Sequence, residues 1–282
     1  GGLYGPANEI YLKVGDKTIP LSGKWKYKIS ASNSDFDFVE YGPNAYPSLL
    51  YNAMVNPLVG LSMRGVIWYQ GENNTNRAKE YYHLFPAMIN DWRKKWGKDF
   101  PFYWVQLANY MDAVEVPSES LWAQVREAQT QTLSLSHTGQ AVIIDIGEAK
   151  DIHPKNKQEV GRRLALHALH NDYGFSDVVC ESPMPKTVRR VQDKIAVQFD
   201  NVADGLIVKN KYGYLMSFAV AGNDGVYKWV QAKVAGKDRV VLSCPDVIDP
   251  VSLRYACGDN PDDANLYNSV GLPATPFEIK IE

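Results

Sequence analysis

An alternation of apolar runs and amphipathic segments between residues 64 and 171 constrains the fold of this chain most strongly. The runs predict strands at 64–70, 100–107 and 140–146, and the segments predict helices at 77–96, 118–135 and 154–171. Strands that alternate with helices form parallel sheets, because each crossover returns the chain to the same edge with a right-handed turn. This region is therefore predicted to be an α/β layer.

Polar residues follow each of the three predicted strands. They stand at 70–74, at 109–110 and at 148–153. The loops that leave the carboxyl ends of parallel strands meet at one edge of the sheet, where binding and catalytic groups collect. We therefore expect these three loops to lie side by side.

Asp151 and His153 stand two residues apart in the last of these loops. A carboxylate in that position can bind one imidazole nitrogen and leave the other nitrogen free as a general base. The same spacing also occurs in capping turns, with Pro154 suited to the first turn of the following helix. On these residues alone, the catalytic pair and the capping turn both remain open.

The segment Gln70-Gly71-Glu72-Asn73-Asn74 is the second candidate site. A glycine directly after a strand lets the backbone approach a ligand, and Gln70 and Asn74 offer neutral amide donors of the kind that an oxyanion hole needs. The alternative is a polar turn in which Asn74 or the next residue caps a helix.

Two further carboxylates require an interpretation. Asp145 could compete with Asp151 as the histidine's partner, but its place in an apolar run favours a structural role. Glu72 could be a turn residue or a partner of Arg64 or Arg126, and we favour an orienting role near the site over a catalytic one. A metal centre built on the Asp-x-His pair and Glu72 is not expected, because no second histidine stands nearby.

The composition excludes several classes of partner. A net charge of −2 over 282 residues gives no electrostatic footprint for nucleic acid or an anionic membrane, and no apolar run approaches the roughly 20 residues that span a bilayer. The 17 Tyr and 7 Trp give weak support for a sugar ligand. Cys180, Cys244 and Cys257 form no C-x-x-C pair, so they predict no metal set and one disulfide at most.

The regions outside the α/β layer have a β pattern. Short strands are expected at 9–14 and 24–29, followed by a loop at 31–46 and about two helical turns at 47–57. After residue 176, short runs separated by Gly, Asp and Asn turns indicate an antiparallel β-sandwich. The predicted domains are residues 1–30, 31–175 and 176–282, and the start of the chain has the pattern of the middle of a β-rich region.

The segments Trp68-Tyr-Gln-Gly-Glu-Asn-Asn74 and Asp151-Ile-His-Pro-Lys-Asn-Lys157 together resemble the sialate O-acetylesterase family, a branch of the SGNH hydrolases. The resemblance covers nearly the whole chain. It continues at Trp122, 126–129, 161–166, 265–268 and 271–274. One small departure is Asn73, where that family usually carries Ser.

The resemblance implies a flavodoxin-like SGNH parallel sheet that carries a serine triad and needs no cofactor or metal. Asp151 and His153 would be its acid and base. Gln70, Gly71 and Asn74 would supply oxyanion contacts, with Glu72 in the same substrate-binding block.

The family's nucleophile is missing from this chain. In the family it lies in an N-terminal Gly-Gln-Ser-Asn segment followed by a second oxyanion block, and neither is present, nor is any Gly-Asp-Ser or Gly-x-Ser-x-Gly. In these relatives a β domain separates the serine block from the Gln-Gly-Glu block, and residues 1–29 resemble its end. We therefore expect this chain to be the C-terminal part of such an esterase, inert by itself, with the serine encoded upstream.

The expected function is the removal of acetyl groups from acetylated carbohydrates. The expected partners are that substrate and the missing N-terminal segment, and the resemblance implies a periplasmic or extracellular location. Because a fold does not fix a function, the alternative is a non-catalytic carbohydrate-binding or accessory module.

Overall fold

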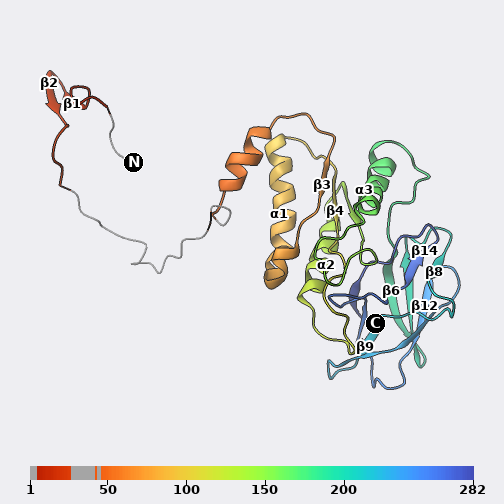
Figure 1. Cartoon of the computed structure of the whole chain (residues 1–282). Helices are drawn as coiled ribbons and strands as arrows, with labels where there is room; N and C mark the ends of the chain where they lie inside the picture. The colour runs from red at the N-terminus through yellow and green to blue at the C-terminus, as the bar shows by residue number, and fades with distance from the viewer. Residues whose placement is uncertain (1–4, 27–41, 43–45) are drawn as a thin grey trace. The chain divides into compact units, whose positions relative to one another are not determined.

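The structure, a computed structural model, describes residues 5–26, 42 and 46–282 (Figure 1). Contacts divide the chain into two units, Gly1–Leu58 and Val59–Glu282. The loop expected at 31–46 lies almost wholly outside the described residues, as does the end of the strand expected at 24–29.

The first unit contains a β-hairpin and a short helical segment. Strands β1 (Tyr11–Val14) and β2 (Lys17–Pro20) pair antiparallel across a two-residue turn. The first strand was expected, but its partner is 17–20, and residues 24–26 have no regular structure. The π-helix η3 (Tyr51–Val55) and the 3-10 helix η4 (Asn56–Leu58) confirm the helical turns expected at 47–57.

The second unit begins with the predicted parallel sheet. Strands β3 (Val66–Trp68), β4 (Phe102–Val105) and β5 (Thr138–Ala141) are hydrogen-bonded in that order, and both pairs are parallel. All three strands are shorter than the apolar runs that predicted them. Val142, Ile143 and Ile144 of the third run leave the ladder but stay buried, so their hydrophobic character reflects packing beyond the sheet.

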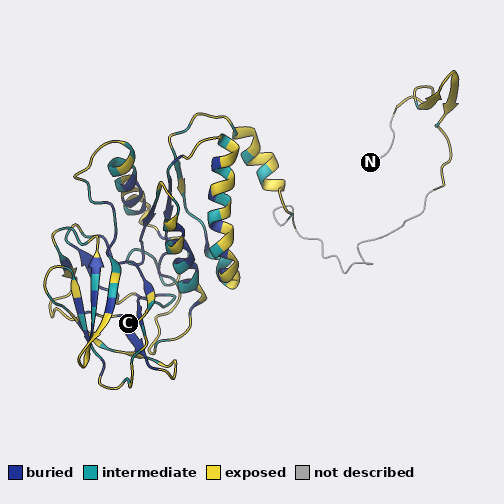
Figure 2. Cartoon of the chain, turned by 180° about the vertical axis from the view of Figure 1, so that it is seen from behind, coloured by how far each residue is buried: buried dark blue, intermediate teal, exposed yellow. Residues whose placement is uncertain are grey.

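Helices cover both faces of this sheet. Their bounds are η5 (Glu72–Arg77), α1 (Ala78–Trp96), α2 (Leu121–Gln131), η6 (Thr132–Ser134) and α3 (Lys157–Asp172). Successive side chains of a strand point to opposite faces. Accordingly, Trp104 packs in one core with residues of α1 and α2, while Tyr103 packs in another with residues of α3. In Figure 2, α1 carries buried residues along one side and exposed residues along the other.

The helix expected from Pro154 begins three residues later, at Lys157. The Asn156 side chain accepts a hydrogen bond of 3.2 Å from the backbone N–H of Glu159, which makes Asn156 the N-cap. The cap defines the helix start, and Pro154 belongs to the loop before it.

Antiparallel sheets form the C-terminal part of the second unit. The strands are β6 (Met184–Val191), β7 (Lys194–Asp200), β8 (Leu206–Val208), β9 (Phe218–Ala221), β10 (Tyr227–Trp229), β11 (Gln231–Val234), β12 (Arg239–Ser243), β13 (Ser252–Tyr255), β14 (Leu266–Asn268) and β15 (Phe277–Lys280). Two four-stranded sheets, β10-β9-β13-β15 and β11-β12-β7-β6, contribute to one hydrophobic core. The sequence patterns did not predict β11, β14 or β15.

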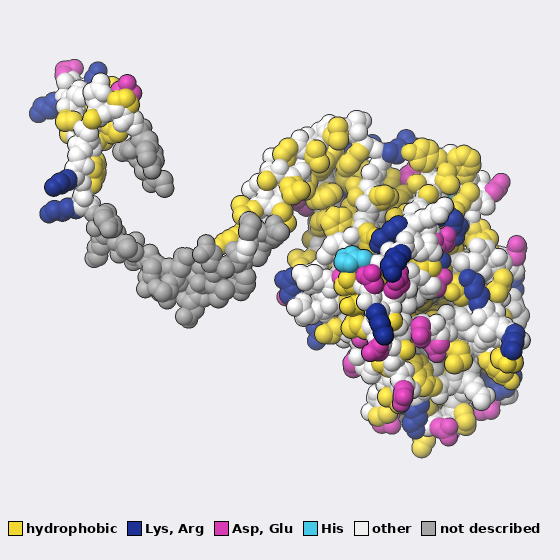
Figure 3. Space-filling model, in the orientation of Figure 1, with side chains coloured by type: hydrophobic (Ala, Val, Ile, Leu, Met, Phe, Trp, Pro, Cys, Tyr) yellow, Lys and Arg dark blue, Asp and Glu magenta, His cyan; other side chains and the backbone are white. Residues whose placement is uncertain are grey.

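The distribution of charged side chains on the surface agrees with the net charge of −2. Figure 3 shows acidic and basic side chains interspersed on the face of the second unit that it displays. Within the described part of the chain, no helix has both the length and the apolar character needed to cross a bilayer.

Arg163 connects α3 to the loop after β5. Its guanidinium is 5% exposed and binds both carboxylate oxygens of Asp145, at 2.6 and 2.9 Å, and Glu159 at 2.8 Å. Its neighbour Arg162 binds the same Glu159 but is 47% exposed. The two arginines therefore share a partner and differ in burial.

We predict that Arg163→Met lowers the free energy of unfolding by about 3–5 kcal/mol, because Asp145 would remain as a buried carboxylate without its cation. The control Arg162→Met should cost less than about 1 kcal/mol, since exposed ion pairs contribute little. Urea denaturation of both variants measures the difference. Equal losses in the two variants would contradict this account.

Candidate active site

The loop after β3 and the loop between β5 and α3 line one cavity of about 390 Å³. Its lining residues are Tyr69, Gln70, Glu72 and Asn73 from the first loop, and Ile152, His153 and Lys157 from the second. The loop after β4 lies beside them, because Met111 N–H donates to Ala149 O at 2.9 Å and Gly147 N–H to Asn109 Oδ1 at 2.7 Å. The expectation that three strand-end loops share one edge is confirmed.

Asp151 and His153 form a turn that also places the carboxylate beside the imidazole. Asp151 Oδ1 accepts the backbone N–H of His153 at 2.9 Å and lies 3.7 Å from His153 Nδ1. The first contact is the capping-type turn, and the second brings the pair close to hydrogen-bond distance. The His153 side chain is 86% exposed, so the ring can turn toward Asp151 while Nε2 faces a reactant.

Hydrogen bonds to Glu148 hold this turn in place. Its carbonyl accepts the backbone N–H of Asp151 at 3.2 Å, and its carboxylate accepts the backbone N–H and the ammonium of Lys155 at 3.1 and 3.0 Å. These hydrogen bonds from Lys155 hold the pKa of Glu148 below its ordinary value. The loop that carries His153 is therefore held on both sides by one residue, through the backbone carbonyl and the carboxylate of Glu148.

The Gln70 side chain has a defined orientation. Tyr81 donates its hydroxyl hydrogen to Gln70 Oε1 at 3.1 Å, and Gln70 Nε2 donates to Asn74 Oδ1 at 2.7 Å. These two hydrogen bonds orient the Gln70 amide with its nitrogen toward Asn74. In the described structure, no protein acceptor takes the amide hydrogens of Asn74. Asn74 and Gly71 belong to the same turn as Gln70, Glu72 and Asn73 but do not themselves line the cavity.

Gly71 is buried at the point where the chain leaves β3. Its φ of +150° favours glycine, and an added Cβ would lie 3.2 Å from both Gln129 Nε2 and Leu107 Cδ2. The Gln129 amide also donates to Gln70 O at 3.3 Å. The backbone here is thus enclosed by α2, which explains a glycine in this motif.

Glu72 lies at the cavity and is paired with neither Arg64 nor Arg126. Arg64 donates to the carbonyl of Asp172, and the Arg126 guanidinium donates to four backbone carbonyls. Burial, with the Glu72 charge as a smaller contribution, raises the pKa of Tyr69 to about 12. The orienting role expected for Glu72 stays a prediction.

Asp145 does not compete for His153. Both of its oxygens bind Arg163, and Tyr267 donates to Oδ2 at 3.3 Å. The structural role predicted for this carboxylate is confirmed.

The sequence patterns gave no role to three residues of the site, Tyr81, Gln129 and Lys157. Tyr81 and Gln129 position Gln70 from α1 and α2, and the Lys157 ammonium lies 4.6 Å from the centre of the Tyr69 ring at the cavity wall. The helix pattern assigns Tyr81 to a buried face, but nothing in it shows what a buried hydroxyl or amide contacts.

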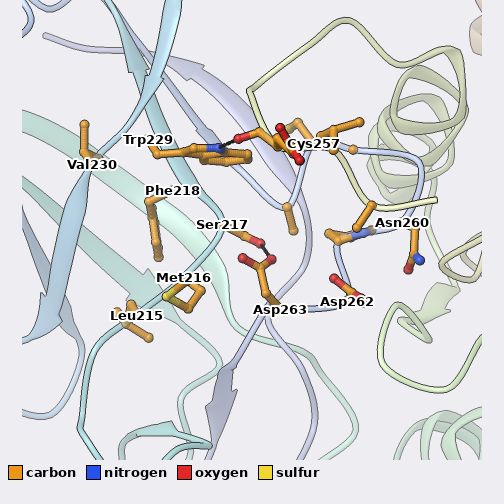
Figure 4. A pocket seen from close by; sticks show the side chains of 16 residues that line it. Leu215, Met216, Ser217, Phe218, Trp229, Val230, Cys257, Asn260, Asp262 and Asp263 are labelled. Carbon is orange, nitrogen blue, oxygen red and sulfur yellow. Dashed lines mark hydrogen bonds between the residues drawn. The ribbon is translucent and has the colours of Figure 1, made fainter.

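A second cavity, of about 320 Å³, lies between the loop after β4 and the antiparallel sheets (Figure 4). Ser217 lines it, has a φ of +62° and donates a hydrogen bond to Asp263. No histidine stands among the residues that line it. This group lacks the imidazole that transfers the proton in a Ser-His-Asp triad, so the cavity at His153 remains the candidate.

Known proteins match this chain over most of its length. Residues 34–170 match the family model "carbohydrate esterase, sialic acid-specific acetylesterase". The sialate O-acetylesterases of Homo sapiens and Rattus norvegicus are 31% and 30% identical over 84% and 86% of this chain. The match covers 49% and 50% of those relatives, so the chain spans about half of their length.

A solved structure is also similar to this chain. The crystal structure of a carbohydrate acetylesterase from Xanthomonas citri superimposes with a TM-score of 0.78 at 44% identity, over 84% of this chain and 54% of that one. The α/β fold and these matches relate the chain to the carbohydrate esterases. Its residues 34–170 belong to the sialic acid-specific acetylesterase family.

We predict that Gly71→Ala lowers the free energy of unfolding by about 1–3 kcal/mol, because its Cβ must displace the Gln129 amide at an unfavourable φ. The control Gly161→Ala should stabilise by up to about 1 kcal/mol, since that helical site has open space around the new methyl group. Thermal and urea unfolding measure both. A neutral Gly71→Ala would show that the turn is not enclosed as described.

Proposed function

We propose that this chain carries the acid–base half of a serine-type carbohydrate O-acetyl esterase. The observation that supports it most directly is the shared cavity, which brings His153 and the amide-bearing turn after β3 to one place. The family supports acetyl-ester hydrolysis as the reaction class.

His153 is the general base in this proposal. Asp151 stabilises the ring through Nδ1, and Nε2 takes the proton from a serine Oγ as that oxygen attacks the acetyl carbonyl. The imidazolium then returns the proton to the sugar oxygen, which leaves as an alcohol. Water, activated by the same nitrogen, releases acetate from the acetyl-serine. The reaction uses no cofactor and no metal ion.

The turn after β3 stabilises the negative charge of the tetrahedral intermediate. We assign two amide donors: Asn74, and Gln70, which is oriented by Tyr81. Gly71 supports the turn from its buried side, where α2 leaves little room for a side chain. Neutral donors that are fixed before the reaction lose little free energy to reorganisation, which makes them effective at an oxyanion.

The serine is proposed to come from a segment outside these 282 residues. No nucleophile motif of the family is present in the chain, and the chain spans about half of its relatives. On the same resemblance we propose a flavodoxin-like SGNH core at 31–175, a β-sandwich at 176–282, the end of an inserted β domain at 1–30, and a periplasmic or extracellular location.

Acetate release from an acetylated aryl ester and from acetylated sugars tests this proposal. A protein extended upstream to include the serine block should be active, and the 282-residue chain should not. In the extended protein, His153→Ala should lower kcat by about 100- to 10,000-fold. Asn74→Ala should lower kcat by about 100- to 1,000-fold with a smaller change in KM.

The exposed helical residue His83 provides the matched control, because His83→Ala should leave kcat unchanged. Activity in the 282-residue chain that His153→Ala abolishes would show that the serine is within it. Full activity of His153→Ala in the extended protein would refute the assigned base.

The second cavity favours the alternative function, a carbohydrate-binding module, as a second candidate. Trp229 is 46% exposed, and its indole N–H donates to Glu115 O at 2.9 Å, which fixes the ring at the cavity wall. Figure 4 shows the Trp229 ring on one side of the cavity and the carboxylates of Asp262 and Asp263 on another. An aromatic face beside carboxylate acceptors suits the apolar and hydroxyl surfaces of a sugar.

We predict that Trp229→Ala weakens retention of a soluble polysaccharide in affinity electrophoresis by about tenfold. His153→Ala should leave that retention unchanged, and so should Trp25→Ala, an exposed tryptophan in the other unit. Retention that depends on His153 and not on Trp229 would assign sugar binding to the catalytic cavity alone.

A further inference from the structure

Three metal-ligating side chains from two separate segments meet away from the candidate active site. A ring nitrogen of His167 on α3, the Cys180 sulfur and a Glu181 carboxylate oxygen all lie within 4.8 Å of one another. Strand β5 lies beside His167, and strand β6 begins shortly after Glu181 in the sequence. Among the described residues, this is the one group of three such side chains with that spacing.

The His167 ring has a defined tautomer. Its Nε2 lies 3.1 Å from Gln140 O, and a carbonyl can only accept, so Nε2 carries the hydrogen and donates it. Nδ1 then holds a lone pair. Metal-binding histidines commonly have this arrangement, in which one nitrogen donates to a carbonyl and the other faces the ion.

The lone pair of His167 has no partner in the protein. Nδ1 is buried without a hydrogen bond, on a side chain that is 1% exposed, and the nearest Glu181 oxygen is 4.0 Å away. Both atoms are acceptors, so they cannot satisfy each other. A proton on Nδ1 would place a charge on a buried ring at a desolvation cost. A cation between the two acceptors satisfies both.

The surroundings hold the imidazole in place. The Tyr103 ring stacks on it with centroids 5.5 Å apart and planes 23° apart. Gly139 lies so close that a Cβ there would be 2.5 Å from Nδ1, so any side chain at that position would displace the ring. A ligand fixed in this way loses little conformational entropy when it binds an ion.

We propose that His167, Cys180 and Glu181 bind a zinc ion. Nitrogen, thiolate and carboxylate ligands suit Zn²⁺ at distances of about 2.0–2.3 Å. The Glu181 side chain is 43% exposed and can swing inward to reach that distance, and a water molecule from the same side completes four ligands. The zinc–sulfur bond replaces the S–H bond of Cys180, and the proton leaves to solvent.

The zinc ion links α3 of the parallel layer to the segment that enters the antiparallel sheets. Cys180 and Glu181 directly precede β6, and His167 lies in the last turns of α3. The ion therefore contributes to stability at the junction of these two parts. This role does not depend on the proposed esterase reaction, because none of the three side chains lines the cavity at His153.

Co²⁺ absorption and Zn²⁺ calorimetry on the metal-stripped 282-residue chain test the proposal. Co²⁺ should give a thiolate-to-metal charge-transfer band, Zn²⁺ should displace it at one ion per chain, and Zn²⁺ should raise the thermal midpoint. Cys180→Ser should abolish the band and lower Zn²⁺ affinity by at least about 100-fold. Glu181→Gln, at a half-exposed position where misfolding is not expected, should lower the affinity while the band remains.

Cys244→Ser is the matched control, because Cys244 is another free buried cysteine, 7% exposed against 6% for Cys180. It should keep the band, the stoichiometry and the rise in thermal midpoint. The absence of a charge-transfer band in the unmutated chain would overturn the proposal. So would a band that survives Cys180→Ser, or Zn²⁺ binding that neither Cys180→Ser nor Glu181→Gln weakens.

Discussion

The buried guanidinium of Arg126 on α2 is the interaction on which the arrangement of the second unit most depends. It donates to four backbone carbonyls, those of Leu107, Ala108, Gly258 and Asp259, at 2.6–2.9 Å. Two of them belong to the loop after β4 and two to a loop of the antiparallel part. Burial lowers the pKa of Arg126 to about 9, and a charge so deeply buried is tolerated only because its hydrogen bonds are complete. The same hydrogen bonds therefore stabilise the cation and fix the loop after β4 relative to the loop that contains residues 258 and 259.

The candidate active site depends on the same helix. Gln129, one turn after Arg126, accepts the backbone N–H of Leu107 at 2.9 Å and donates to Gln70 O. The loop after β4 in turn bonds to the loop that carries His153, through Met111 and Ala149. One helix thus positions the amide-bearing turn directly and the histidine loop through a neighbour. The His153 side chain stays 86% exposed, as the proposed reaction with a substrate requires.

The sequence predicted the features that follow from periodicity and from local motifs. The three parallel strands, the helices on their faces and the meeting of the strand-end loops were all foreseen from apolar spacing. The helix start at Pro154 was wrong because the side-chain cap at Asn156 determines where the helix begins, and a proline preference is weaker than a made hydrogen bond. Tyr81 could not be foreseen as an orienting residue, because its partner is eleven positions away. His167 could not be foreseen beside Cys180, since that proximity depends on how the chain leaves α3.

The central claim is that His153 activates a serine from outside this chain at the cavity it shares with the turn after β3. Labelling the upstream-extended protein with a fluorophosphonate, followed by mass spectrometry of the modified peptide, tests that claim most directly. The account predicts one phosphonylated serine, located before Gly1, and loss of labelling in His153→Ala. A label on a serine within the 282 residues, or labelling that persists without the His153 imidazole, would contradict it.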